Sequence, residues 1–126
     1  MKQLNKIYLA IPYSRIDKNE AYKIANEITV HFLALGNNVF SPITHSHPLT
    51  KYNVPGDWSF WSRIDYQFLD WADEMVVIIP PESQGGMKAI EESVGVQAEI
   101  KYAKEHNISV SYFDYNLKLR HWSITN

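Results

Sequence analysis

The stretch EMVVIIP at residues 74–80 decides the fold class. After Glu74 it is an unbroken run of apolar side chains, rich in β-branched residues, that ends at Pro80. The run lacks the alternation of polar and apolar residues that marks a strand with one solvated face. It is typical of a central strand in a parallel sheet, where helices cover both faces. We therefore predict that residues 74–80 form the middle of a parallel sheet.

Strands and helices alternate on both sides of this segment. Runs rich in β-formers predict strands at 6–11, 38–41 and 108–113, and apolar residues three or four apart predict helices at 19–35, 57–71 and 94–106. Segments 42–56 and 81–92 contain prolines or glycines without periodicity, so we predict loops there. Ser14 and Asp17 are candidate caps of the first helix. The alternation predicts an α/β fold with a mainly parallel sheet of four or five strands.

Length, charge and composition narrow the function. The chain has 126 residues, which favours one domain over 1–126, with the tail 114–126 forming either a fifth strand or an arm for oligomer contacts. A net charge of −2 predicts no nucleic-acid polymer as partner, and the lack of cysteine excludes cysteine nucleophiles. The apolar run before Pro12 is too short for a secretion signal, and no stretch is long enough to span a membrane. We expect a cytoplasmic protein.

A glutamate lies on the apolar side of the last predicted helix, in SVGVQAEI at residues 93–100. Glu99 precedes Ile100 on this stripe, where an ionised carboxylate costs free energy unless something compensates it. Gly95, one turn earlier, leaves room for a ligand beside Glu99, and amides at the helix start favour an ionised carboxylate. Ser93 is placed to cap the helix or to bind an anion. The alternative is a partly exposed Glu99, with Gly95 packed tightly against the sheet.

Further candidate residues lie where a parallel sheet binds ligands, at the carboxyl ends of its strands. The segments bordering that edge contain Tyr13, Ser14, Arg15, His45, His47 and Ser93, which we take as candidate substrate contacts. The two histidines have no evident third ligand, so we expect no metal and predict that they bind phosphate or shape a lid. Asp65 is an unusual residue for a helix interior, and either a solvated helix face or a function explains it. Tyr8 either reaches the crevice or packs in the core.

Several common motifs are absent. The chain contains neither GxxxxGK[ST] nor GxGxxG, which argues against a nucleoside triphosphatase and against a dinucleotide-dependent dehydrogenase. Neither Ser14 nor Ser93 lies in the GxSxG turn of α/β-hydrolases. The chemistry must therefore come from another arrangement of residues.

Four stretches together resemble a known superfamily. They are IYLAIPYSR, GNNVFSPITHSHP, RIDYQFLDWADEMVVI and SVGVQAEIKYA, and they resemble parts of nucleoside 2-deoxyribosyltransferase-like proteins. The resemblance extends to about residue 113. Within the superfamily, the chain most resembles a branch of short bacterial and phage proteins with YLAxPYS and SPIxHSHP signatures. The S-x-G-V-x-x-E element is also similar to that of 2′-deoxynucleoside 5′-phosphate N-hydrolases. The resemblance implies a flavodoxin-like (Rossmann-like) three-layer sandwich, assembled into homo-oligomers with sites near subunit interfaces.

The resemblance also implies roles for individual residues. Glu99 matches the nucleophile that attacks the anomeric carbon of the sugar. Asp65, eight residues before Asp73, matches an aspartate that holds the sugar or assists proton transfer. Tyr8 matches a first-strand tyrosine that lines the site.

Binding of a 5′-phosphate is implied less completely. Ser93 matches a serine that contributes to phosphate binding in the N-hydrolases. Those enzymes have a glycine-rich stretch after the first strand, where this chain has IPYSRID. Ser14 and Arg15 are the residues that stand in its place.

The residues and the resemblance together predict cleavage of the N-glycosidic bond of a (deoxy)nucleoside or its 5′-monophosphate. A carboxylate captures the oxocarbenium-like sugar while an acid protonates the departing base, as in retaining glycoside hydrolysis. Water as acceptor gives hydrolysis, another base gives transfer, and neither needs a metal or organic cofactor. Two alternatives remain open: a nucleotide-binding or sensing module without turnover, and an enzyme that cleaves NAD or ADP-ribose.

Overall fold

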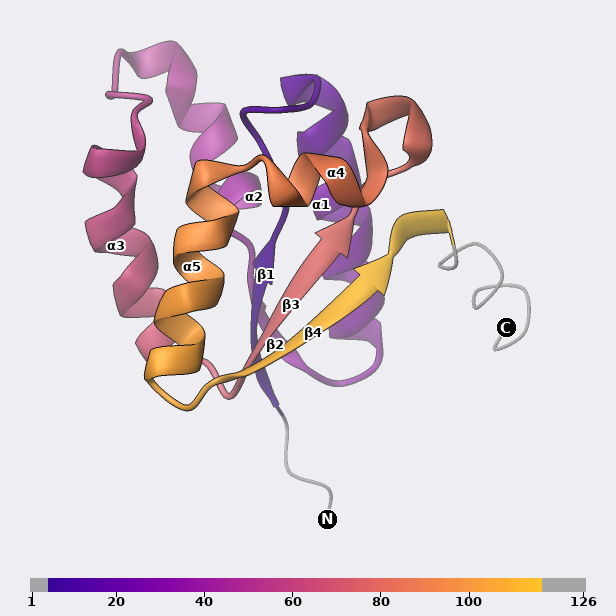
Figure 1. Ribbon diagram of the computed structural model, residues 1–126, viewed down its shortest axis with the longest axis vertical. Coiled ribbons are helices and arrows are strands. Elements are labelled where there is room, and N and C mark those ends of the chain that lie inside the picture. Colours follow the sequence, from indigo (N-terminus) through magenta and orange to yellow (C-terminus); the bar gives the residue numbers. More distant parts are fainter. Residues whose placement is uncertain (1–4, 117–126) are drawn as a thin grey trace.

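In the part of the chain that the structure describes, the sheet has four strands, and all of them are parallel. A computed structural model describes residues 5–116 (Figure 1). The strands are β1 (Lys6–Ala10), β2 (Asn38–Phe40), β3 (Glu74–Ile79) and β4 (Ser109–Asp114). Their order is β2-β1-β3-β4, and β3 pairs in parallel with both β1 and β4. The prediction that residues 74–80 form a central parallel strand is confirmed.

Helices cover both faces of the sheet, which gives three layers (Figure 1). On one face α1 (Lys18–Ala34) packs against Ile7 and Leu9 of β1. On the other face α3 (Trp58–Trp71) and α5 (Val94–Glu105) pack against Tyr8 and Ala10. Successive residues of β1 are thus buried on opposite faces, as a central strand requires. The expected flavodoxin-like α/β sandwich is confirmed.

Two segments predicted as loops contain short helices. Residues 42–56 include α2 (Pro42–Ser46) and the 3-10 helix η1 (His47–Tyr52), and residues 81–92 include η2 (Glu82–Gln84) and α4 (Gly86–Glu91). Ser41 caps α2 by accepting the Thr44 amide at 3.4 Å, and Pro42 occupies the first helical position, which suits its fixed φ. Gly85, with φ of 103°, makes the left-handed turn between η2 and α4.

The start of α1 shows which of the two candidate residues caps the helix. The Asp17 carboxylate accepts the Glu20 amide at 2.9 Å and caps the helix. Ser14 lies in the turn before it and is exposed. Ser14 is therefore not the cap, and its hydroxyl remains available at the carboxyl end of β1.

Strand order locates the crevice where a ligand can bind. From β1 the chain goes to β2 on one side, and the next strand, β3, lies on the other side of β1. The connections therefore diverge at the carboxyl ends of β1 and β3, and ligands of open parallel sheets bind at such a switch point.

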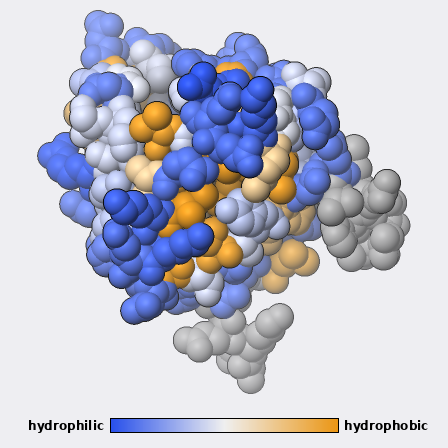
Figure 2. All heavy atoms as spheres, in the orientation of Figure 1, coloured by the Kyte–Doolittle hydropathy of each residue, from blue (hydrophilic) through white to orange (hydrophobic). Residues whose placement is uncertain are grey.

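The face shown in Figure 2 carries apolar side chains between α5 and the last two strands. Ile79 of β3 and Val110 of β4 are half-buried and pack against the core cluster that includes α5, and Tyr112 of β4 is 46% exposed. The predicted tail begins at the end of β4, and from residue 117 it lies outside the described residues. The homo-oligomer implied by the resemblance stays a prediction. Within residues 5–116 no helix has the length and apolar character needed to cross a bilayer.

Candidate functional site

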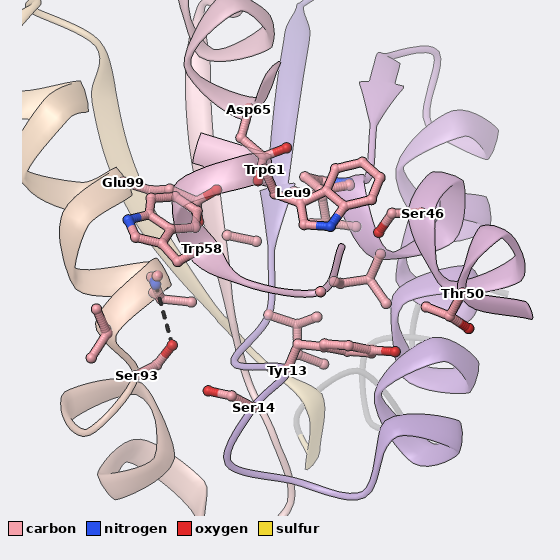
Figure 3. Close-up of a pocket in the computed structure, with 18 residues that line it drawn as sticks. Leu9, Tyr13, Ser14, Ser46, Thr50, Trp58, Trp61, Asp65, Ser93 and Glu99 are labelled. Atoms are coloured by element: carbon pink, nitrogen blue, oxygen red, sulfur yellow. Dashed lines mark hydrogen bonds between the residues drawn. The ribbon is translucent and has the colours of Figure 1, made fainter. Parts of the chain in front are cut away.

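A cavity of about 210 Å³ opens at the carboxyl end of β1 (Figure 3). It lies between the α2–η1 segment and the first turns of α3 and α5. The side chains that carry its polar and aromatic character are Tyr13, Ser14, Ser46, Thr50, Trp58, Trp61, Asp65, Ser93 and Glu99. These residues come from four separate parts of the chain, so only the folded chain brings them together.

Glu99 and Asp65 form a buried carboxyl pair on one wall of the cavity. Glu99 is 5% exposed on α5, and Asp65 is 7% exposed on the facing side of α3. Each carboxyl group alters the pKa of the other, so the two side chains act on one another as a pair inside the fold. The solvated alternative for Asp65 and the partly exposed alternative for Glu99 are therefore both wrong.

Tyr8 lies behind the pair and does not line the cavity. Its side chain is completely buried, and its hydroxyl donates a short hydrogen bond to Glu99 Oε2. Tyr8 therefore contacts the carboxylate from the side of the sheet. The expectation that Tyr8 itself lines the site is not met by this geometry.

Burial controls the protonation of the pair. Burial raises the pKa of Glu99 well above its ordinary value, and the charge of Asp65 raises it further, while the hydrogen bond from Tyr8 opposes the shift. Burial also raises the pKa of Asp65 to about 6, with hydrogen bonds from Glu99 and Tyr8 acting in the opposite direction. Both shifts disfavour the charged form, so the pair resists carrying two negative charges at once.

This result differs from the expected ionised glutamate. Glu99 lies in the second turn of α5, whereas the favourable effect of helix-start amides is confined to the first turn. Ser93, the N-cap, accepts the Val96 amide at 3.2 Å and satisfies part of that first turn. The amides are thus too far along the helix to offset the desolvation of Glu99.

Gly95 faces the cavity and also packs against an aromatic ring. A Cβ atom at this position would lie 3.4 Å from the nearest ring carbon of Trp58. The glycine lies in the cavity wall, and its packing partner is α3 and not the sheet. Ser93 and Ser14 bring hydroxyl groups to the same end of the cavity (Figure 3).

Aromatic rings form much of the remaining wall, and sequence reasoning missed two of them. Tyr13 was predicted, but Trp58 and Trp61 at the start of α3 were not. The signal available was the WSFW pattern, which places two tryptophans three residues apart on one helix face. Ser46 and Thr50 were missed as well, although Ser46 stands between the two histidines that were chosen.

Three predicted contacts lie outside the cavity. Arg15 is exposed, and its Nε donates to the Glu92 carbonyl at 3.1 Å. His45 is exposed beside Phe40, with ring centroids 5.9 Å apart. His47 contacts the Tyr13 hydroxyl through Nδ1 at 2.6 Å, so it reaches the cavity only through Tyr13. Among residues 5–116 no three metal-ligating side chains of His, Asp or Glu gather into a site.

Residues 5–115 match a protein family described as "Domain of unknown function (DUF1937)". The chain belongs to the DUF1937 family. None of the curated proteins compared with it gives a match.

A solved structure shares the fold of this DUF1937 protein. It is a 2-deoxyribosyltransferase from the psychrotolerant bacterium Bacillus psychrosaccharolyticus, described as a biocatalyst for nucleoside synthesis. The two chains are 22% identical with a TM-score of 0.54, and the similarity covers 86% of this chain and 72% of the other. At this identity the likeness establishes the architecture alone.

Proposed function

We propose that this DUF1937 protein cleaves the N-glycosidic bond of a (deoxy)nucleoside or its 5′-monophosphate, with Glu99 as the nucleophile. The observation that carries the proposal is the buried Glu99–Asp65 pair at the wall of a cavity with aromatic sides. Two carboxyl groups in different protonation states are what glycosidic cleavage needs. The fold shared with a 2-deoxyribosyltransferase supports the same class of reaction.

The first step moves a proton of the pair toward the leaving base. In the reactive complex the proton of the pair lies on Asp65 and Glu99 is ionised. Asp65 donates this proton to a nitrogen of the base as the C1′–N bond breaks, which leaves Asp65 ionised. The freed carboxylate of Glu99 forms a bond to C1′, so the sugar becomes a covalent ester of the enzyme. The hydrogen bond from Tyr8 stabilises negative charge on Glu99 before and after the attack.

The second step regenerates the pair. Ionised Asp65 takes a proton from water, the water oxygen bonds to C1′, and the ester bond to Glu99 breaks. The products are the free sugar and the starting carboxyl pair. A second base in place of water gives transfer by the same route.

A binding or sensing function without turnover is the second candidate. The raised pKa of Glu99 favours it, because a protonated carboxyl group binds a hydroxyl or a base well but is a poor nucleophile. Cleavage of NAD is less well supported. The cavity of about 210 Å³ is smaller than the roughly 300–1,000 Å³ that drug-sized ligands occupy.

A chromatographic screen of nucleosides and nucleoside monophosphates for released base tests the enzymatic proposal. Glu99→Gln should reduce base release at least about 1,000-fold, because it removes a nucleophile that no neighbouring group replaces. Glu105→Gln is the matched control, because Glu105 is an exposed glutamate on the same helix. Binding of nucleosides without any released base would instead favour the sensing function, and unchanged release by Glu99→Gln would exclude Glu99 as nucleophile.

A further inference from the structure

One end of the cavity is built by residues that no motif identifies. Trp61 of α3 and Ser46 and Thr50 of the α2–η1 segment line it, with Pro42 and Ile43 beside them. In Figure 3 Trp61, Ser46 and Thr50 lie on the side of the cavity away from Ser93. In the same view Glu99 and Asp65 lie along the top of the cavity beside Trp61, and Ser93 and Ser14 lie at the bottom.

Trp61 offers a flat apolar face that is held in place. Its Nε1 donates to the Pro55 carbonyl at 2.7 Å, and its ring meets Phe60 edge to face, with centroids 5.1 Å apart. The indole is thus fixed by the chain that follows η1. A preorganised aromatic face binds a planar heterocycle without the cost of ordering a mobile side chain.

The hydroxyl groups of the α2–η1 segment supply the polar part of this end. Thr50 Oγ1 donates its proton to the His47 carbonyl at 2.7 Å, so its lone pairs remain available to accept from an amino or ring N–H group. Ser46 directs its hydroxyl toward the cavity in Figure 3 and can donate or accept.

The segment itself is tied to the body of the protein. The Thr44 hydroxyl donates to Asn26 Oδ1 of α1 at 2.7 Å, and His47 contacts the Tyr13 hydroxyl at 2.6 Å. The Tyr22 ring stacks on His47, with centroids 4.6 Å apart. The hydroxyl groups are therefore held at fixed positions relative to Trp61, which is what discrimination between similar bases requires.

We propose that Trp61, Ser46 and Thr50 form the nucleobase subsite of this protein and select the base. The base lies on the face of Trp61 with its edge toward the two hydroxyl groups. The sugar lies at Glu99 and Asp65, and its 5′ end points toward Ser93 and Ser14. The inference rests on the proposed nucleoside chemistry and adds the residues that choose among nucleosides.

Binding of nucleosides to the inactive Glu99→Gln protein tests the subsite separately from catalysis. Isothermal titration with four deoxynucleosides (of adenine, guanine, cytosine and thymine) and the four free bases gives an order of affinities. Adding Trp61→Ala to the Glu99→Gln protein should lower the affinity for the tightest-binding ligand about 10-fold or more, which is the loss expected for one stacked base. Trp61→Phe should recover part of that loss. Trp71→Ala is the control, because Trp71 ends the same helix and does not line this cavity.

The Ser46→Ala variant tests base selection by a measurement that would not change if Ser46 had only a structural role. It should change the order of affinities among the bases, since it removes a group that meets only some base edges. If Trp61→Ala fails to fold, the test depends on Trp61→Phe and Ser46→Ala. The subsite is excluded if both variants bind every base with unchanged affinity and in an unchanged order of affinities. Binding of no nucleoside or base at millimolar concentration overturns it too.

Catalytic and subsite assignments fail in different ways. Nucleoside binding that depends on Trp61, without base release by the unmodified protein, removes the enzymatic proposal and leaves the subsite. Base release with a KM unchanged by Trp61→Ala removes the subsite and leaves the enzymatic proposal.

Discussion

At the scale of residues, the Tyr8 hydroxyl is the group that lowers the pKa of Glu99 against the effects of burial and of Asp65. Tyr8→Phe removes this hydrogen bond without opening a large cavity, so the pKa of Glu99 rises further. If cleavage needs ionised Glu99, the acid limb of the pH–rate profile moves to higher pH. The rate near pH 7 falls about 10-fold, in line with a hydrogen bond to a charged group.

A pH–rate profile of the variant and of Tyr102→Phe checks this expectation. Tyr102 is a suitable control because its hydroxyl donates to Asp70 at 2.6 Å, on the surface and away from the pair. A profile of unchanged shape in Tyr8→Phe would show that the hydrogen bond does not set the ionisation of Glu99.

Asp65 makes the stability of the protein depend on pH in an unusual direction. Its pKa rises from 3.8 to about 6 on folding, so the unfolded chain loses this proton first as the pH increases. Below about pH 4 Asp65 is protonated in both the folded and the unfolded chain, so it does not change the free energy of unfolding. Above about pH 6 its buried charge lowers the free energy of unfolding by the full amount. Two pKa units correspond to roughly 3 kcal/mol.

Asp65→Asn removes that penalty and also removes the charge that raises the pKa of Glu99. We expect the variant to gain about 2–3 kcal/mol in free energy of unfolding at pH 8 and almost nothing at pH 4. Urea unfolding of both proteins between pH 4 and pH 8 measures the difference. A variant less stable than the parent by the same amount at every pH would mean that the pair is a structural hydrogen bond only.

Residue-level reasoning found the acids more readily than the aromatic walls, for a physical reason. A glutamate on an apolar helical stripe or an aspartate inside a helix conflicts with local preference, and such a conflict is visible in the sequence. Trp61 contradicts no local preference, because a tryptophan on an amphipathic helix commonly packs in the core. Its place at the cavity depends on the path of residues 42–56, which local preference does not determine. Arg15 was predicted as a contact because it follows the first strand, but a position near that strand did not imply access to the cavity.

At the scale of elements, the cap of α5 has a counterpart at α1. Ser93 accepts the Val96 amide at 3.2 Å and lines the cavity, whereas Asp17 accepts the Glu20 amide at 2.9 Å and does not. Ser93→Ala and Asp17→Ala should each lower the free energy of unfolding by about 1 kcal/mol. Only Ser93→Ala should also weaken nucleoside binding, because it removes a hydroxyl at the proposed 5′ end of the ligand.

Denaturant unfolding and nucleoside titration on both variants separate the two roles of Ser93. Equal losses of stability with equal affinities would assign Ser93 to capping alone. The comparison works because the two helices begin with the same type of side chain-to-amide hydrogen bond.

The long elements were predictable and the short ones were not. Residues 74–80 and the helices at 19–35, 57–71 and 94–106 repeat their pattern over enough positions to be recognised, and the structure differs only at their ends. A helix such as α2 is a single turn, so it has no periodicity, and prolines 42 and 48 indicated a loop. In fact proline suits a first helical turn, where its missing N–H has no partner to lose.

At the scale of the whole molecule, the cavity is bordered by parts of the chain that are far apart in the sequence. Its walls come from the end of β1, the α2–η1 segment, α3 and α5. A ligand seated there links both helices of one face to the segment that follows β2. It binds the folded chain and not the unfolded one, so it stabilises the entire fold by mass action.

A thermal-shift panel of nucleosides, their 5′-monophosphates and NAD measures this coupling. At 100 times its Kd a ligand adds about 2.7 kcal/mol, which raises Tm by roughly 10 °C in a chain of this size. We expect nucleosides to give such a shift and NAD to give little, because a cavity of about 210 Å³ is small for a dinucleotide. If binding relieves the charge of Asp65, the shift should be larger at pH 8 than at pH 5, since the pKa of about 6 leaves this carboxyl group ionised only at the higher pH. A shift with NAD equal to that with nucleosides would instead place part of the ligand outside the cavity, and would return NAD cleavage to consideration.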